Sequence, residues 1–333
     1  MIHTLPLVKF LRKKYKEASI EYVTSENVAD LLKNCCPYIN HAWIYNKKNK
    51  KQLSGKIFSV NKNKIDYFFN LHNSLSFFFF NLFYIRAKNF FQYKKDIKFH
   101  AVVNFAQTYD PLLSAFGLET KTVFAGDCNE ILNKYGLEAN RYTCFVTGVG
   151  KERPNRAWQF EKWFNLTKKF LNAEKDFKVV LLGGEYEQKI IENWYKLAKD
   201  VSAYKDEEEQ YDLKSLPGFK NRAINLTGKL SLPEVAKIIS KAAHVISCDT
   251  GLLHLGAALS VKTIGLYGPT LPKRSGPFTG DYLVLQAKNC ECISNYVEIK
   301  KCRKTGELSG YCMNSLTVEE VLSNISCNLV EIV

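Results

Sequence analysis

Short apolar runs alternate with amphipathic stretches through the second half of the chain, and this alternation predicts strands followed by helices. Strands are expected where β-branched and aromatic residues run together, at 142–147, 177–182, 223–226, 244–248 and 262–266. Helices are expected where apolar residues recur three or four positions apart, at 160–171, 187–198, 232–243 and 251–259. Continuous apolar strands joined by helices are typical of parallel sheets, so the sequence predicts an α/β fold with helices on both faces of a parallel sheet.

The first half follows the same rhythm less regularly. Strands are expected at 19–24, 42–45, 65–71 and 122–125, and helices at 5–14 and 28–33. A chain of 333 residues suits two domains, and we place the boundary near 137–141. The predicted domains are therefore residues 1–139 and 140–333.

The most apolar stretch is LSFFFFNLFYI, residues 75–85. It is too short to cross a bilayer, which needs about 20 residues. A buried helix or strand is the favoured interpretation, and a membrane-docking patch is the alternative. The residues after Met1 lack the basic segment of a secretory signal, and the ten cysteines then indicate reduced thiols in a reducing compartment. A cytoplasmic location is expected.

The charge balance points to an anionic partner. Lys and Arg outnumber Asp and Glu by 47 to 33, a net charge of +14. Residues 1–139 hold 20 of the basic and 11 of the acidic residues. Nucleic acid, an acidic membrane surface or a phosphorylated substrate would each fit. No recognised nucleic-acid module is visible, so a nucleic-acid-binding protein is the distant alternative.

The segment SCDTGLLHLGAA, residues 247–258, carries the clearest candidate site. It follows a predicted strand and begins a predicted helix, with Asp249 or Thr250 as the cap. Gly251 lets another group approach the backbone, and His254 lies in the first turn. The N–H groups of a helix N-terminus bind anions, which predicts a phosphate site. A capped helix with a structural histidine remains the alternative.

Two further loops extend this candidate site. The loop at 148–158 offers Lys151, Arg153 and Arg156, and basic side chains there would suit a diphosphate. The loop at 183–187 follows a strand and ends on Glu187, an acid that could bind ribose hydroxyls. G-x-G-x-x-G and Walker A motifs are absent, which argues against a dinucleotide oxidoreductase and a P-loop ATPase.

Four cysteines gather late in the chain: Cys290, Cys292, Cys302 and Cys312. Their spacing is not one of the standard zinc-site spacings, although four thiolates could bind zinc. Packing thiols and a metal site both remain open at this point.

Taken in order, these segments resemble glycosyltransferase family 9, the ADP-heptose:lipopolysaccharide heptosyltransferases. The resemblance is carried by RAW at 156–158, GGEYE at 183–187, LTGKLSL at 226–232, DTGLLHLGAA at 249–258 and GPT at 268–270. It implies a GT-B fold, in which two Rossmann-like domains face a cleft. The nucleotide sugar would lie on the second domain and the acceptor on the first.

The resemblance also implies roles for individual residues. The donor diphosphate would be held by Asp249, Thr250, Gly251, His254 and Arg156, the last standing where the family usually has a lysine. Glu187 would bind the ribose, and Lys229 and Leu230 would border the base. The reaction would invert the configuration at the anomeric carbon of the sugar, and it would use neither a metal nor another cofactor. The donor would be a nucleotide sugar, with ADP-heptose favoured and a similar sugar left open. The acceptor would be the lipopolysaccharide inner core or a lipid A-type molecule at the inner membrane, which enzymes of this kind could contact peripherally.

One departure from the family concerns catalysis. Family members begin with a strand and a Gly-Asp loop, whose aspartate is taken as the general base, just before the HTLP segment at 3–6. This sequence starts at Met1, after that point, so no catalytic residue is assigned here. The expected base lies upstream of Met1 if the start is truncated or misassigned. A catalytically inactive relative that binds nucleotide or glycolipid is the alternative.

Overall fold

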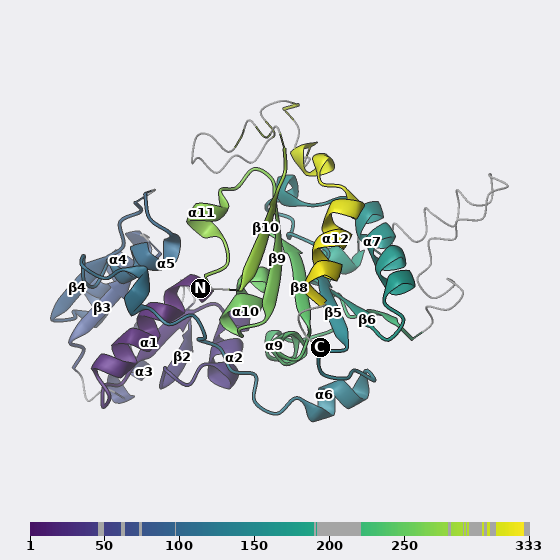
Figure 1. The fold of residues 1–333 in the computed structure, drawn as a ribbon. Coiled ribbons are helices and arrows are strands. Elements are labelled where there is room, and N and C mark those ends of the chain that lie inside the picture. The colour runs from purple at the N-terminus through teal and green to yellow at the C-terminus, as the bar shows by residue number, and fades with distance from the viewer. Residues whose placement is uncertain are drawn as a thin grey trace.

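The computed structural model describes residues 1–45, 50–60, 64–72, 75–96, 98–189, 191, 221–278, 281–288, 290, 292, 302, 305–306 and 311–329. Figure 1 shows one large parallel sheet in the second half of the chain, with the smaller strands of the first half beside it. The first-half helices α1 (Leu5–Lys14) and α2 (Glu26–Cys35) lie between these two parts.

The large sheet has six strands in the order β10-β9-β8-β5-β6-β7, and every neighbouring pair is parallel. The strands are β5 (Tyr142–Val146), β6 (Lys178–Leu182), β7 (Ala223–Asn225), β8 (His244–Cys248), β9 (Lys262–Tyr267) and β10 (Tyr282–Gln286). Numbered along this half of the chain, the order is 6-5-4-1-2-3, which is that of a Rossmann fold. The strand order reverses between β5 and β8.

Helices cover both faces of this sheet because successive strand residues point to opposite sides. On one face, Phe145 packs with α7 (Phe160–Ala173) and α12 (Val318–Leu329). On the other face, Cys144 and Val146 pack with α9 (Leu232–Ser240) and α10 (Gly251–Ala258). The helix α9 begins with the expected capping box, in which Ser231 and Glu234 satisfy each other's backbone N–H groups.

The first half contains two separate pairs of parallel strands. β1 (Glu21–Thr24) pairs with β2 (His41–Ile44), and β3 (Tyr67–Asn70) pairs with β4 (Asn89–Gln92). The remaining elements of this half are η1 (Ile2–Thr4), α3 (Lys50–Val60), α4 (Leu75–Phe80), η2 (Asn81–Ile85), α5 (Ala101–Ala106), η3 (Ala115–Gly117) and α6 (Asn129–Lys134). Short elements elsewhere are η4 (Pro154–Arg156), α11 (Pro272–Ser275) and η6 (Tyr311–Ser315).

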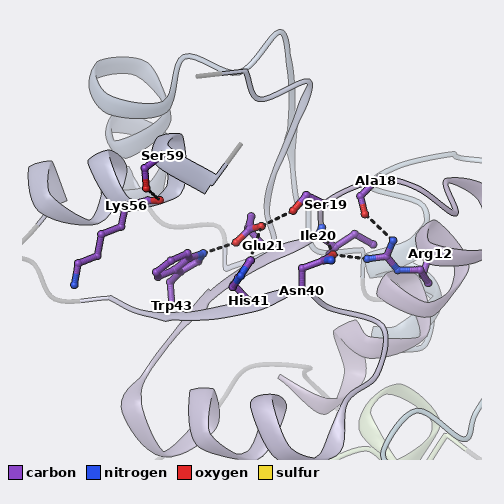
Figure 2. A network of polar contacts seen from close by, with 10 residues as sticks. All are labelled: Arg12, Ala18, Ser19, Ile20, Glu21, Asn40, His41, Trp43, Lys56 and Ser59. Carbon is purple, nitrogen blue, oxygen red and sulfur yellow. Dashed lines mark hydrogen bonds and ion pairs between the residues drawn. The ribbon is translucent and has the colours of Figure 1, made fainter. Parts of the chain in front are cut away.

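A polar network fastens α1 to the first strand pair (Figure 2). The Arg12 guanidinium donates to the carbonyl of Ala18 at 2.6 Å and to Asn40 Oδ1 at 2.5 Å. Glu21 begins β1 and accepts hydrogen bonds from Ser19 Oγ and from the indole N–H of Trp43 on β2. The network provides hydrogen-bond partners for polar groups at the starts of β1 and β2, and it links α1 to both strands.

The predicted strand at 122–125 is wrong. The segment is irregular, and its N–H groups bond to helix ends. The N–H groups of Thr122 and Val123 donate to the carbonyl of Ala258 at the end of α10, at 3.0 and 3.2 Å. Phe124 donates to the carbonyl of Cys35 at the end of α2, at 2.8 Å. The segment therefore ties first-half and second-half helices together instead of extending a sheet.

The apolar segment 75–85 is helical, and only part of it is buried. Phe80 and Ile85 are buried, as expected, but Leu75, Leu82 and Phe83 are exposed. The expectation of a wholly buried element is therefore wrong for its outer face. Among the described residues, no helix combines the length and the apolar character needed to cross a membrane.

His244 opens β8 in the middle of the sheet. It is completely buried, and neither ring nitrogen has a hydrogen-bond partner. Burial, and then the positive charge of Lys262, lower the pKa of His244 to about 4. The folded protein therefore holds this imidazole neutral.

Acid should destabilise the fold through His244. The unfolded chain takes up this proton near pH 6.5, and the folded chain only near pH 4. The free energy of unfolding is therefore unaffected by His244 above about pH 6.5. It falls by about 3 kcal/mol as the pH is lowered from there toward 4. Urea unfolding at pH 7 and pH 4.5 should show a smaller acid loss in His244→Leu than in the wild type. The exposed His72, changed to Gln, is the control, and equal acid losses in wild type and His244→Leu would contradict the prediction.

Candidate functional site

Two loops meet where the strand order of the large sheet reverses. β5 ends at Val146 and leads to Gly148, and β8 ends at Cys248 and leads to Asp249. The strands are adjacent and parallel, so both loops lie at the same edge of the sheet. In open α/β sheets this crevice is the usual place for a ligand.

Asp249 lies at the centre of this edge and is almost completely buried. Its Oδ2 accepts a hydrogen bond from Arg156 Nη1 at 2.8 Å, and its Oδ1 lies 3.4 Å from His254 Nε2. Burial alone would raise the pKa of Asp249, but the hydrogen bond from His254 and the charge of Arg156 outweigh it and lower the pKa. The charged carboxylate therefore orients a guanidinium and an imidazole.

The N-terminus of α10 faces the same place. Thr250 is the N-cap, and its side chain makes no capping hydrogen bond; its hydroxyl lies 3.0 Å from Ser247 Oγ instead. At Gly251, a Cβ atom would meet nothing within 4 Å. The first N–H groups of an eight-residue helix thus remain open to an anion.

A cavity of about 400 Å³ connects these groups. The second half of the chain contributes Gly148, Gly150, Gly183, Glu187, Leu232, Thr250, Gly251 and His254 to its wall, and the first half contributes Ile2, His3, Val28 and Leu31. Both halves of the chain contribute, so the cavity lies between them. Its volume is within the range of small-molecule sites.

Glu187 shapes one wall of the cavity. Its Oε1 accepts from the Gly150 N–H at 2.7 Å, and its Oε2 from the Gly184 N–H at 2.9 Å. A Cβ atom at Gly148 would stand 1.7 Å from Glu187 Cγ, so only glycine fits there. Each carboxylate oxygen has a second lone pair, which could accept from a ligand hydroxyl.

The structure brings most of the predicted site residues together. Glu187, Thr250, Gly251 and His254 line the cavity. Asp249 lies behind this lining, beside His254, and Arg156 is linked to the cavity through its ion pair with Asp249. Lys229 and Leu230 do not line it. The Lys229 ammonium donates to the carbonyl of Asn225 at 2.8 Å, and Leu230 packs against the core. Leu232, two residues later, stands at the wall instead.

His3, a histidine of the first half that lines the cavity, was missed as a site residue. The His3 ring lies 4.3 Å from the His254 ring and 5.4 Å from the His100 ring, centroid to centroid. Burial, and then the charges of His254 and His100, hold the pKa of His3 well below its usual value. His3 belongs to the HTLP segment that carries part of the family resemblance. Its contact with His254 spans about 250 residues of sequence and leaves no local pattern.

The four late cysteines lie near one another. A hydrogen bond with Cys290, then burial, and then the neighbouring Cys292 and Cys302 thiols raise the pKa of Cys312. In the described part of the chain, no group of three or more His, Cys, Asp or Glu side chains is arranged to hold a metal ion.

Comparison with known proteins identifies the family. The sequence model of glycosyltransferase family 9 (heptosyltransferase) matches residues 88–305, well over half of the chain. The chain belongs to glycosyltransferase family 9. The match includes the second-half residues at and around the cavity, from Gly148 to His254.

Individual family 9 members resemble the chain over shorter stretches. Lipooligosaccharide heptosyltransferase 2 of Haemophilus influenzae is 33% identical over 88 residues, covering 26% of this chain and 23% of that protein. Lipopolysaccharide heptosyltransferase 2 of Escherichia coli is 22% identical over 211 residues, covering 63% of this chain and 53% of that protein. The matched segments thus span between about a quarter and a half of these relatives.

A solved family 9 structure matches along the whole chain. The E. coli ADP-heptose lipopolysaccharide heptosyltransferase II superimposes with a TM-score of 0.72 at 18% identity, covering 99% of this chain and 95% of that one. At this identity the likeness establishes the fold. The chain therefore has the expected α/β fold of the GT-B type.

Proposed function

We propose that this family 9 chain binds ADP-heptose and transfers the heptose to the lipopolysaccharide inner core at the cytoplasmic face of the inner membrane. The observation that carries the proposal is the Arg156–Asp249–His254 arrangement beside the N-terminus of α10. These groups bring N–H donors together near one end of the cavity between the two halves of the chain. The names of the similar enzymes, which are heptosyltransferases, supply the sugar and the acceptor class.

The geometry suggests how the donor would lie. The diphosphate would sit on the N–H groups of Thr250 and Gly251, with Arg156 and His254 beside it. The ribose hydroxyls would reach Glu187, which already accepts from two glycine N–H groups. The adenine would continue toward Leu232, because the apolar wall of the cavity extends there. Asp249 would act as a positioning residue, since its charge is neutralised by Arg156.

In this arrangement the reaction is a displacement at the anomeric carbon. An acceptor hydroxyl forms the new C–O bond as the bond to the diphosphate breaks, and the configuration inverts. The acceptor O–H bond also breaks, and its proton passes to a general base or to solvent. Negative charge grows on the departing ADP, and the Arg156 guanidinium and the helix N-terminus would stabilise it. These groups of the chain itself would supply that stabilisation.

Calorimetry with ADP tests the proposed donor site. Asp249→Ala and His254→Ala should each weaken ADP binding about 10- to 100-fold, since each removes a charge-assisted contact or the group that positions it. Glu138→Ala, at an exposed carboxylate in the first half, is the matched control and should bind as the wild type does. UDP and GDP should bind more weakly than ADP. Unchanged ADP affinity in both site variants would overturn the assignment.

A further inference from the structure

The helical segment formed by α4 and η2 carries apolar or aromatic side chains at every position except Ser76 and Asn81. It reads LSFFFF in α4 and NLFYI in the π-helical turn η2. Its inner face is covered, because Phe80 and Ile85 are buried against Leu53 and Ile57 of α3. A helix that is apolar on all sides is ordinarily buried on all sides, so its other face calls for an explanation.

The outer face has no protein cover in the described structure. Exposed fractions are 75% for Leu75, 45% for Phe79, 50% for Leu82 and 60% for Phe83. Phe79 and Phe83, one turn apart, stack on each other with centroids 5.9 Å apart. Contiguous apolar side chains of this size on a surface mark an interaction site. We call these four residues the outer apolar face.

Basic residues follow directly on this face. Arg86 ends η2 in a left-handed backbone conformation (φ 52°), and Lys88 leads into β4. Both side chains are exposed, as are those of Lys94 and Lys95 just after β4. Between positions 75 and 98 the sequence has five basic residues and one acidic residue, Asp96. An apolar face that is followed at once in the sequence by exposed basic side chains complements an anionic surface.

The size of the segment favours one kind of partner. Eleven helical residues span about 16 Å, roughly half the hydrocarbon thickness of a bilayer, so the segment can lie in an interface but cannot cross it. Aromatic and leucine side chains on one face, beside Lys and Arg, are the features of interfacial helices. In a dimer formed through this face, the basic residues of the two copies would lie close together and repel one another, which disfavours self-association.

We propose that the outer apolar face docks into the surface of an anionic lipid bilayer, with Arg86 and Lys88 at the headgroups. Leu75, Phe79, Leu82 and Phe83 enter the boundary between headgroups and acyl chains. Figure 1 shows α4 at the end of the molecule away from β5 and β6, and none of the residues of the outer apolar face lines the cavity. The inference rests on the proposed function only in placing the acceptor in a membrane.

Vesicle sedimentation tests the docking surface with the full chain. Vesicles of phosphatidylcholine and phosphatidylglycerol in equal parts should bind the wild type, and vesicles of phosphatidylcholine alone should bind it weakly. Phe79→Ser/Phe83→Ser should lower partition into the mixed vesicles about tenfold or more, since both rings lose their lipid contacts. Leu112→Ser, at a residue 91% exposed elsewhere in the first half, is the matched control and should bind normally.

The charge contribution is tested separately. Arg86→Glu/Lys88→Glu should abolish the preference for phosphatidylglycerol, while Lys134→Glu/Lys241→Glu, at exposed lysines near α6 and α9, should preserve it. Equal vesicle binding by wild type and Phe79→Ser/Phe83→Ser would overturn the proposal. A dimer of the wild type that this double variant dissociates, without any vesicle binding, would overturn it in favour of self-association. The docking variants should bind ADP with the affinity of the wild type. If the wild type itself does not bind ADP, the proposed donor site is wrong, but the docking result is unaffected.

Discussion

Replacing Arg156 with methionine should weaken ADP binding about 10- to 100-fold and lower the free energy of unfolding by about 3–5 kcal/mol. Arg156 Nη1 donates to both the side chain and the carbonyl of Asp249, at 2.8 and 3.3 Å. The Asp249 side chain is only 5% exposed. Without the guanidinium, a negative charge remains buried beside the proposed diphosphate and repels it. Calorimetry with ADP and urea unfolding measure the two effects.

A second variant separates the two roles of Arg156. Arg156→Met/Asp249→Asn removes both charges, so most of the lost stability should return. ADP binding should stay weak if the guanidinium contacts the diphosphate, as proposed. Full recovery of ADP affinity in the double variant would show that Arg156 only neutralises Asp249. The stability difference between Arg156→Met and wild type should also shrink at acid pH, because protonation of Asp249 relieves the uncompensated charge.

The second half of the fold was largely predictable because its signals are local. The strand at 244–248 and the helix beginning at 232 are confirmed at the expected residues, and the others shift by a few positions. Apolar runs mark strands that are covered on both faces, and Ser231 with Glu234 marks a helix start. Most of the expected helix at 187–198 lies outside the described residues. The proposed domain division, 1–139 and 140–333, stays a prediction.

The first half was less predictable because its partners are distant in sequence. An extended, apolar segment at 122–125 reads as a strand, yet its N–H groups bond to α2 and α10. β10 was missed because its apolar run, YLVL, is short; the strand lies at the edge of the sheet, where Tyr282 is exposed. The run at 75–85 was assigned to the interior because apolar composition carries no information about which face is covered.

The residues of the candidate site also fall into two groups, those with a local sequence signal and those defined by contacts between distant parts of the chain. Asp249, Thr250 and Gly251 follow from a strand-to-helix junction, which is a local feature. The pairing of Arg156 with Asp249 depends on the meeting of two loops at the reversal of strand order, and the parallel sheet predicts that meeting. The contact of His3 with His254 joins two halves of the chain, and no periodicity encodes it.

Adding one methyl group at Gly148 should displace Glu187 from the wall of the cavity. In Gly148→Ala the new Cβ would lie 1.7 Å from Glu187 Cγ and 2.3 Å from its Cδ, so the glutamate must swing away. The N–H groups of Gly150 and Gly184 then lose their acceptor. We expect a loss of about 2–4 kcal/mol in the free energy of unfolding. ADP binding should fall about tenfold or more, because the proposed ribose contact goes with the displaced carboxylate.

A double-mutant cycle shows whether the collision with Glu187 is the cause. Glu187→Ala alone loses the two hydrogen bonds, and Gly148→Ala then adds no clash. The double variant should therefore be about 1–2 kcal/mol more stable than the sum of the single effects predicts. Gly55→Ala, where a Cβ meets nothing within 4 Å in α3, is the matched control and should leave stability unchanged or slightly raised. Additive losses at Gly148 and Glu187 would contradict the collision, because the penalty at Gly148 would then persist with the glutamate side chain removed.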